Sequence, residues 1–134
     1  KEDGNNSEIL NSLGNIYEKK RDFKNSEKFY LKSIQENKNN EIALSNLAIL
    51  YHNLGREKDA KKLYNKVLSL NSNNIGALYN LSNIDKSIID EKKITLLKNL
   101  IKNAKLNNFD IASCYFILAE NEKKIKISIK KLIY

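Results

Sequence analysis

Apolar residues recur along the chain at i, i+3, i+4 and i+7, the spacing of one helix face, and nowhere alternate for long with period two. Between residues 41 and 74, two such stripes are separated by a break at Asn53-Leu54-Gly55. The first stripe holds Leu44, Leu47, Leu50 and Tyr51, and the second holds Ala60, Leu63, Tyr64, Val67 and Leu68. This pattern predicts a hairpin of two amphipathic helices.

Polar doublets divide the chain at a fixed interval. Asn-Asn pairs stand at residues 5–6, 39–40, 73–74 and 107–108, each 34 residues after the last. A period of this length is typical of repeat proteins, in which stacked units bury a shared core. Because a side-chain oxygen before a helix can accept from its free backbone N–H groups, we interpret the doublets as helix N-caps.

The first two units align without a gap. Residues 9–30, ILNSLGNIYEKKRDFKNSEKFY, lie over residues 43–64, ALSNLAILYHNLGREKDAKKLY. The shared columns are large, small and aromatic in the first helix, then small and aromatic in the second. They are Leu10, Leu13, Gly14, Tyr17, Ser26 and Tyr30, and then Leu44, Leu47, Ala48, Tyr51, Gly55, Ala60 and Tyr64. This pattern resembles the tetratricopeptide repeat, a helix-turn-helix unit of 34 residues.

The resemblance implies an all-α fold, a right-handed α-solenoid of antiparallel helix hairpins with about eight helices. We expect one array over residues 1–134, with repeats of about 7–40, 41–74, 75–108 and 109–134. The pattern weakens along the chain, since Asp85 replaces the first-helix tyrosine of the third unit and Phe116 the small residue of the fourth. The last repeat is therefore expected to be divergent or truncated, with a wider hairpin whose second helix carries Ile125, Ile129, Leu132 and Ile133.

Composition limits the possible classes of protein. A length of 134 residues with 41% hydrophobic content suits one packed domain. The single cysteine, Cys114, excludes an internal disulfide, and the single histidine, His52, leaves no cluster with metal-ligand spacing. This use of cysteine and histidine fits an intracellular, cytoplasmic protein, and the lack of a long apolar run or a leader pattern predicts neither a membrane span nor a signal peptide. The absence of Met suggests a piece of a longer chain, and 21 Asn suggest an AT-rich genome.

Motifs of catalysis are missing from the sequence. It has no Gly-rich phosphate loop, no Ser-centred elbow and no Cys-His pair placed by a motif, while its acidic residues are scattered over predicted helix surfaces. We therefore expect a protein that is not an enzyme, with no cofactor, no metal and no small-molecule substrate. Cys114 falls within a predicted helix, where a structural thiol is the favoured interpretation.

In the family, the first helix of each unit lines a concave groove and the second forms the convex back. Transferred to this chain, the groove becomes polar, rich in amides and nearly neutral, while most lysines fall on second helices. A row of side-chain amides can pair with the backbone of a peptide without depending on its sequence. The resemblance thus implies a protein-protein interaction module, an adaptor or scaffold that binds a peptide or helix of a partner protein. The candidate contact residues are Asn11, Asn15, Asn46, His52, Tyr79, Asn80 and Asn83.

Some family members hold the acidic C-terminal tail of chaperones in a clamp of two Asn and three basic residues. The matching positions here are Asn11, Asn15, Asn46, Gly76 and Asn80, so the Asn pair is present and all three basic residues are absent. Each charge-assisted hydrogen bond contributes about 1.5 to 3 kcal/mol, and the three losses make an acidic chaperone tail an unfavourable partner.

Two alternatives remain open. Residues 86–134 carry 11 basic and 5 acidic side chains, whereas residues 1–85 carry 13 and 11, so the net charge of +8 lies mostly in the C-terminal part. This Lys-rich part could bind RNA or an anionic membrane by electrostatic attraction. The array could also be a purely structural spacer arm between domains of a larger protein.

Overall fold

The structure is a computed structural model that describes residues 3–103 and 105–133. Within this part of the chain it contains seven α-helices, one short 3-10 helix and no strand, as the all-α prediction requires. The chain divides into two compact units, residues 1–72 and 73–134.

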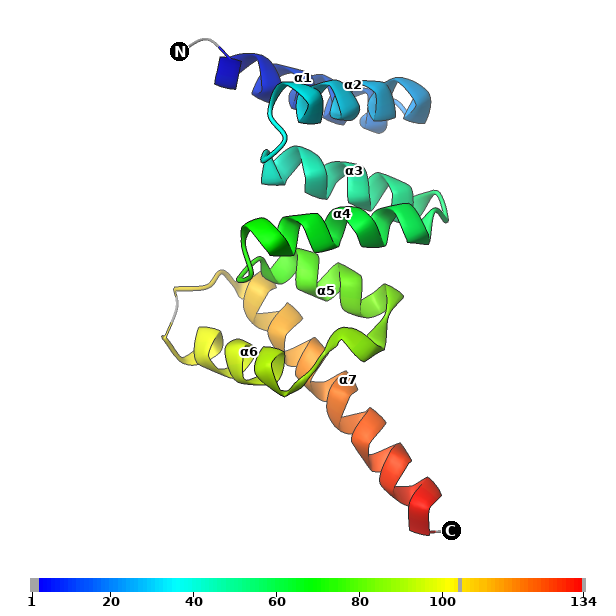
Figure 1. Cartoon of the computed structure of the whole chain (residues 1–134), viewed down its shortest axis with the longest axis vertical. Helices are drawn as coiled ribbons and strands as arrows, with labels where there is room; N and C mark the ends of the chain where they lie inside the picture. The colour runs from blue at the N-terminus through cyan, green and yellow to red at the C-terminus, as the bar shows by residue number, and fades with distance from the viewer. Residues whose placement is uncertain (1–2, 104, 134) are drawn as a thin grey trace. The chain divides into compact units, whose positions relative to one another are not determined.

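The first unit consists of two helical hairpins. Figure 1 shows them in blue to green, each made of two antiparallel helices, with α3 packed against both helices of the first hairpin. The helices are α1 (Asp3–Lys19), α2 (Phe23–Glu36), α3 (Glu41–Asn53) and α4 (Glu57–Leu70). The predicted columns fill the interior: Leu44, Leu47, Ala48, Tyr51, Ala60 and Tyr64 are all buried. The sequence pattern thus fixes which face of each helix points into the core.

Asparagine side chains begin three of the four first helices. Asn40 Oδ1 accepts from Ala43 N at 3.1 Å, and Asn74 Oδ1 accepts from Ala77 N at 2.9 Å. Asn107 Oδ1 accepts from Asp110 N at 2.9 Å. The predicted capping role is confirmed at these three doublets, where each cap contributes about 1 kcal/mol. It is wrong for Asn5-Asn6, because α1 begins at Asp3 and the first doublet lies inside the helix.

The turns within the first two hairpins have the same backbone geometry. Arg21 and Gly55, which are 34 residues apart, both have positive φ, 60° and 75°. At each turn the residue that follows donates its backbone N–H to the carbonyl five residues back, Asp22 to Tyr17 and Arg56 to Tyr51. This left-handed helix end favours glycine and places Arg21 in a conformation that costs an L-residue about 1 kcal/mol.

We expect Arg21→Gly to stabilise the protein by about 0.5 to 1 kcal/mol, because glycine adopts this conformation without a Cβ penalty. The matched variant Gly55→Arg should destabilise it by about 1 to 2 kcal/mol for the same reason. A Cβ atom at Gly55 would meet no atom within 4 Å, so the expected cost comes from the positive φ. Urea unfolding followed by circular dichroism measures both variants. Changes of the same sign would contradict the explanation.

The second unit departs from the hairpin pattern. It consists of α5 (Ile75–Ile84), the 3-10 helix η1 (Lys86–Ile88), α6 (Glu91–Asn103) and α7 (Asn108–Ile133). α5 ends early because Asp85, at the position of the expected tyrosine, accepts from Ser87 N at 3.0 Å and starts the 3-10 turn. Leu97 is the fully buried residue of α6, and α7 packs against both α5 and α6.

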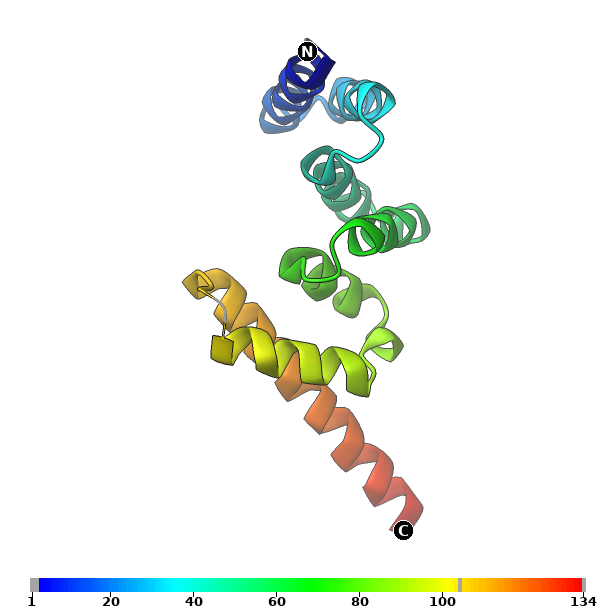
Figure 2. The ribbon, with the colours of Figure 1, turned by 60° about the vertical axis from the view of Figure 1, so that its left-hand side comes forward.

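The fourth repeat does not form the expected hairpin. α7 is one continuous helix of 26 residues, and Figures 1 and 2 both show its C-terminal half extending past α6. The first repeat begins its second helix with the Asp22 cap, and the second repeat ends its first helix at Gly55. In the fourth repeat, Lys124 stands at the position of Asp22 and Lys123 at that of Gly55. Neither lysine can end a helix in these ways, so the helix continues. Of the predicted apolar face, Ile125 is described and is 46% exposed.

Candidate functional site

Three of the predicted contact residues form one amide cluster between α1 and α3. Asn46 Nδ2, on α3, donates to Asn11 Oδ1 at 3.0 Å and to Asn15 Oδ1 at 3.1 Å, both on α1. Asn11 and Asn15 lie one helical turn apart, so a single amide from the neighbouring repeat bridges them. The cluster therefore joins the first helices of two successive repeats.

A buried tyrosine of α2 donates a hydrogen bond to this cluster. The hydroxyl of Tyr30 lies 2.6 Å from Asn15 Oδ1 and 2.7 Å from Glu18 Oε2, and its one proton is shared between these two acceptors. Tyr30 is fully buried, and burial together with the Glu18 carboxylate raises the pKa of its phenol. The phenol stays neutral and keeps donating, so the orientation of Asn15 is fixed by the core.

The cluster retains unused hydrogen-bonding groups. Within the described part of the chain, no hydrogen bond uses Asn46 Oδ1 or the Nδ2 groups of Asn11 and Asn15. Asn15 and Asn46 are partly exposed, whereas Asn11 is 8% exposed and mainly positions Asn46. Two partly exposed residues of the cluster thus keep one acceptor and one amino group without a hydrogen bond among the described residues.

Two isoleucines flank Asn46 on the same face of α3. Ile42 and Ile49 stand four residues before and three after it, which is helical spacing. Ile42 is 65% exposed and Ile49 37%. His52 follows one turn further on and is half-buried. The polar residues of this face were predicted from the sequence, whereas Ile42, the more exposed of the two isoleucines, was not.

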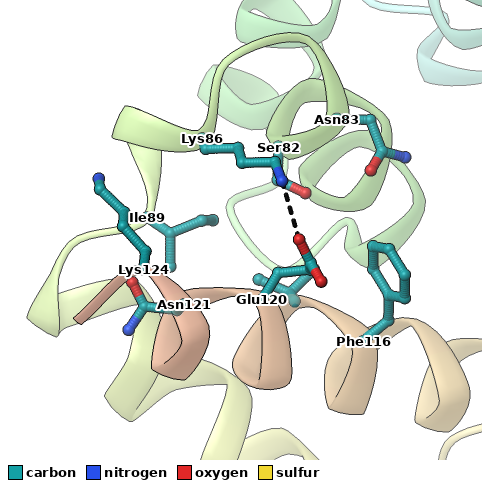
Figure 3. Close-up of a pocket in the computed structure, with 9 residues that line it drawn as sticks. Ser82, Asn83, Lys86, Ile89, Phe116, Glu120, Asn121 and Lys124 are labelled. Carbon is teal, nitrogen blue, oxygen red and sulfur yellow. Dashed lines mark hydrogen bonds and ion pairs between the residues drawn. The ribbon is translucent and has the colours of Figure 1, made fainter. Parts of the chain in front are cut away.

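The remaining predicted residues, Tyr79, Asn80 and Asn83, belong to the second unit. The Tyr79 ring meets Phe116 of α7 edge-on, with centroids 5.4 Å apart. Asn80 is half-buried, and Asn83 is exposed beside a small pocket between α5, η1 and α7 (Figure 3). Ile89, Phe116 and Ile117 form the apolar part of this pocket, whose space of about 20 Å³ suits one water-sized group.

An ion-pair group lies at the edge of this pocket. Glu120 accepts from Lys86 Nζ and Lys123 Nζ, both at 2.8 Å, and Figure 3 shows Lys86 reaching from the neighbouring segment. The hydrogen bonds and charges of Lys123 and Lys86 lower the pKa of Glu120 to about 2. This pairing was not predicted from the sequence, although Lys86 and Glu120 are 34 residues apart and so occupy equivalent positions of successive repeats.

A buried polar cluster connects the ends of the first hairpin with the start of the second. Ser7 Oγ donates to Ser33 O at 2.9 Å, and Ser33 Oγ donates to Ser7 O at 2.7 Å. Asn40 Nδ2 donates to Ser7 Oγ at 2.9 Å, in addition to its capping bond. Both serines are fully buried, so these bonds keep their hydroxyls satisfied.

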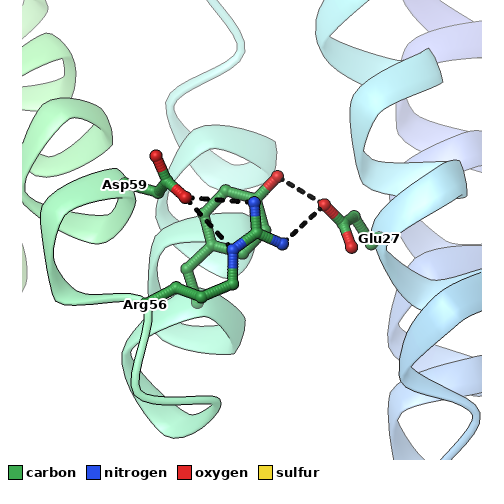
Figure 4. Close-up of polar contacts among 4 residues, drawn as sticks. Glu27, Arg56 and Asp59 are labelled. Atoms are coloured by element: carbon green, nitrogen blue, oxygen red, sulfur yellow. Dashed lines mark hydrogen bonds and ion pairs between the residues drawn. The ribbon is translucent and has the colours of Figure 1, made fainter.

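A second cluster joins the same two repeats at the other end. Glu27 Oε1 accepts from Tyr51 Oη at 2.7 Å and from Arg56 at 2.9 Å, and Asp59 also pairs with Arg56 (Figure 4). The Arg56 guanidinium lies 3.8 Å from the Tyr51 ring centroid, a cation–π contact. Burial opposes the charge of Glu27, but the bonds from Tyr51 and Arg56 outweigh it and lower its pKa. Both clusters were missed because the bonds that join the two repeats connect residues 24 or more positions apart.

Comparison with known families decides the classification. Sequence profiles described as Tetratricopeptide repeat match residues 7–40 and 42–74, which together make half of the chain. The chain belongs to the tetratricopeptide repeat family. Repeats of this family serve as protein-interaction modules.

Solved structures of the family share the fold. The tetratricopeptide repeat chain is similar to one titled "First TPR of Spaghetti (RPAP3) bound to HSP90 peptide SRMEEVD", with 17% identity, TM-score 0.64, and 89% of this chain and 95% of that one covered. The Arabidopsis OM64 TPR domain gives 17% identity, TM-score 0.64 and coverages of 88% and 98%. The Sgt2 TPR domain from Aspergillus fumigatus is 17% identical, with a TM-score of 0.66, and the match covers 90% of this chain and 82% of that one. A search of curated proteins found no match.

Residues 3–103 and 105–133 include no group of three or more His, Cys, Asp or Glu side chains arranged to hold a metal ion. Among them, too, no helix has the length and apolar character to span a bilayer. Cys114 is fully buried in α7, and burial raises the pKa of its thiol, which disfavours the reactive thiolate.

The Glu120 pairs give the tetratricopeptide repeat chain an expected pH dependence. Because the folded pKa is lowered from 4.5 to about 2, ionised Glu120 stabilises the fold above pH 4.5. This contribution is lost as the pH falls through the window from 4.5 to about 2. In Glu120→Gln, thermal unfolding followed by circular dichroism should show a shallower loss of stability across that window. An unchanged pH profile would mean that the lysine pairs do not persist in solution.

Proposed function

We propose that this chain is a non-enzymatic adaptor that binds a peptide or helix of a partner protein on the Asn-lined face of its first helices. The observation that carries the proposal is the amide cluster, in which Asn15 and Asn46 are held in place and keep one amino group and one oxygen free. A peptide backbone offers a matching carbonyl and N–H pair at each residue. Because Tyr30 and Asn11 already orient these amides, little side-chain entropy is lost on binding.

The candidate residues of the second unit are proposed as contacts of that unit. Tyr79, Asn80 and Asn83 lie on α5 at positions that correspond to those of the first two repeats, and His52 belongs to the face of α3. Their part in binding is proposed from these positions and from the partial exposure of their side chains.

An acidic tail of the kind named in the Spaghetti structure is a poor candidate for this face. That structure holds the HSP90 peptide SRMEEVD, which carries three carboxylate side groups. In this chain the clamp positions Asn11, Gly76 and Asn80 carry no positive charge, and Asn11 is in addition nearly buried. We therefore propose a partner segment that is not acidic.

The test is an affinity capture with the chain as bait, followed by titration of each captured partner. The double variant Asn46→Ala with Asn80→Ala removes two candidate contacts. It should weaken a true partner by about tenfold, since each hydrogen bond contributes roughly 0.5 to 1.5 kcal/mol. The matched control is Asn65→Ala with Asn99→Ala, which removes exposed amides of α4 and α6. Partners whose affinity is unchanged in the first variant, or equally reduced in the second, would refute the proposed face.

The lysines of α7 support a second candidate function, binding of a polyanion such as RNA. Lys123, Lys124, Lys126, Lys130 and Lys131 are all exposed on the C-terminal half of this helix. Binding carried by phosphate contacts should weaken steeply between roughly 50 and 200 mM salt. Titration of labelled single-stranded RNA against the chain and its Lys126→Gln, Lys130→Gln variant measures this slope. An affinity that changes with neither salt nor the variant would exclude the second candidate.

A further inference from the structure

We infer that the face formed by α1 and α3 selects an extended segment with two cationic side chains four or five residues apart and an apolar residue between them. This inference rests on the proposed function and names the chemistry of its partner. It follows from two carboxylates and two isoleucines that surround the amide cluster.

The first carboxylate belongs to a hollow at the N-terminal end of the face. Glu8, Asn11, Asn37, Asn40 and Ile42 line this hollow. Glu8 is exposed and makes no ion pair within the described part of the chain. A cation that enters the hollow therefore meets an available carboxylate beside the apolar surface of Ile42.

The second carboxylate stands at the other end. Asn15, Glu18 and Lys19, all at the C-terminal end of α1, line a second hollow. Tyr30 contacts Glu18 through Oε2, which leaves Oε1 for an incoming donor. Lys19 is exposed beside it, so this end attracts a cation less strongly than the Glu8 end.

The distance between the carboxylates sets the spacing of the partner's cations. Glu8 and Glu18 are ten residues apart on α1, which is about 15 Å along a helix axis. An extended chain advances roughly 3.3 Å per residue, so four or five residues cover this distance. Asn15 and Asn46 lie between the two ends, where they can pair with the backbone of such a segment.

Charge is divided unevenly between the first and second helices of the first unit. From residue 6 to 19 and from 41 to 53, the first helices carry three acidic side chains and one basic, net −2. The second helices, α2 and α4, carry seven lysines against four acids, net +3. A cationic segment is thus attracted to the α1 and α3 face and repelled by the opposite one.

The apolar requirement comes from Ile42 and Ile49. They lie seven residues apart, about 10 Å along α3, on either side of Asn46. At 65% and 37% exposure, they offer apolar area that an incoming aliphatic or aromatic side chain would cover. Apolar residues placed between the two cations would reach this surface.

A library of random dodecapeptides displayed on phage is the probe. Selection on the immobilised chain should enrich sequences with net positive charge, two basic residues four or five apart and an apolar residue between them. Enrichment of acidic sequences, of amphipathic helices with apolar spacing of three and four, or of no sequence at all would overturn the inference.

The enriched peptide, made synthetically, then tests whether the Glu8 and Glu18 carboxylates cause the selection. Its Kd should rise about fivefold in Glu8→Gln with Glu18→Gln, which keeps the acceptor for Tyr30. The matched control is Glu36→Gln with Glu57→Gln, two exposed acids of the second helices, which should leave the Kd unchanged. Equal effects of both pairs, or none of the first, would overturn the inference.

Asn46→Ala distinguishes failure of the inference from failure of the proposed function. If the peptide loses affinity in Asn46→Ala but not in the Glu8, Glu18 variant, the face binds peptides without the proposed charge selection. If the peptide responds to neither variant, both proposals fail. A weakening in both supports both.

Discussion

Gly14→Ala is expected to destabilise the protein by about 2 to 3 kcal/mol. A methyl group at Gly14 would lie 3.0 Å from Cγ of Tyr30 and closer still to Cδ1 and Cε1. Tyr30 is fully buried and its hydroxyl is tied to Asn15 and Glu18, so the ring cannot move away without losing those contacts. Overpacking of this kind costs roughly 1 to 3 kcal/mol, which outweighs the better helix propensity of alanine.

The same substitution at Gly76 is the matched control. There an added methyl meets only Asn74 Oδ1, at 3.6 Å, so Gly76→Ala should stabilise α5 by up to about 1 kcal/mol. Urea unfolding followed by circular dichroism measures both variants. A Gly14→Ala protein as stable as the parent would show that the hairpin of α1 and α2 packs less closely than described.

Tyr30→Phe and Tyr64→Phe are expected to change stability in opposite directions, although the two tyrosines occupy equivalent positions of successive repeats. Removing the Tyr30 hydroxyl leaves Glu18 Oε2 without its donor and takes one of two donors from Asn15 Oδ1, which keeps the bond from Asn46, and it should cost about 1 to 2 kcal/mol. Tyr64 Oη is buried and has no partner among the described residues. Removing it should stabilise the protein by about 1 kcal/mol, because no desolvated hydroxyl is left.

The residues that correspond to Asn15 and Glu18 explain the difference. Thirty-four positions on stand Ile49 and His52, and no hydrogen bond joins either to Tyr64 in the described structure. Ile49→Asn should therefore supply a partner, and its effect should be more favourable with Tyr64 than in the Tyr64→Phe background. A double-mutant cycle from thermal unfolding measures this coupling. Equal effects of the two Phe variants would contradict the assignment of partners.

The columns of the repeat were predictable because they depend on local spacing. Leu44, Leu47 and Tyr51 recur at helical intervals, and burial follows from that periodicity alone. The caps at Asn40 and Asn74 were equally accessible, since a cap acts on a backbone amide three residues away. Contacts of this kind can be predicted because the residues that determine them lie within a few positions of each other.

The features that escaped sequence analysis arise from contacts between distant residues or from missing stop signals. The continuous α7 results from two ordinary lysines at a turn position, where the absence of a cap is a weaker signal than its presence. The pairing of Asn46 with Asn11 and Asn15 depends on how two hairpins stack, so the row of amides was predicted but its internal hydrogen bonds were not. The same applies to Glu8 and Ile42, which share a hollow only in the folded chain.

The junction formed by Glu27, Tyr51 and Arg56 gives the repeats a fixed order. In the first repeat, Asp22 stands where the second has Arg56, and Tyr17 stands where it has Tyr51. A second copy of the first repeat, grafted in place of the second, would bring Asp22 towards Glu27 and set two carboxylates against each other. The two repeats have the same length and similar backbones, yet the side chains at this junction fit only when the first repeat precedes the second. A duplication or exchange of these repeats would therefore require new side chains at the junction.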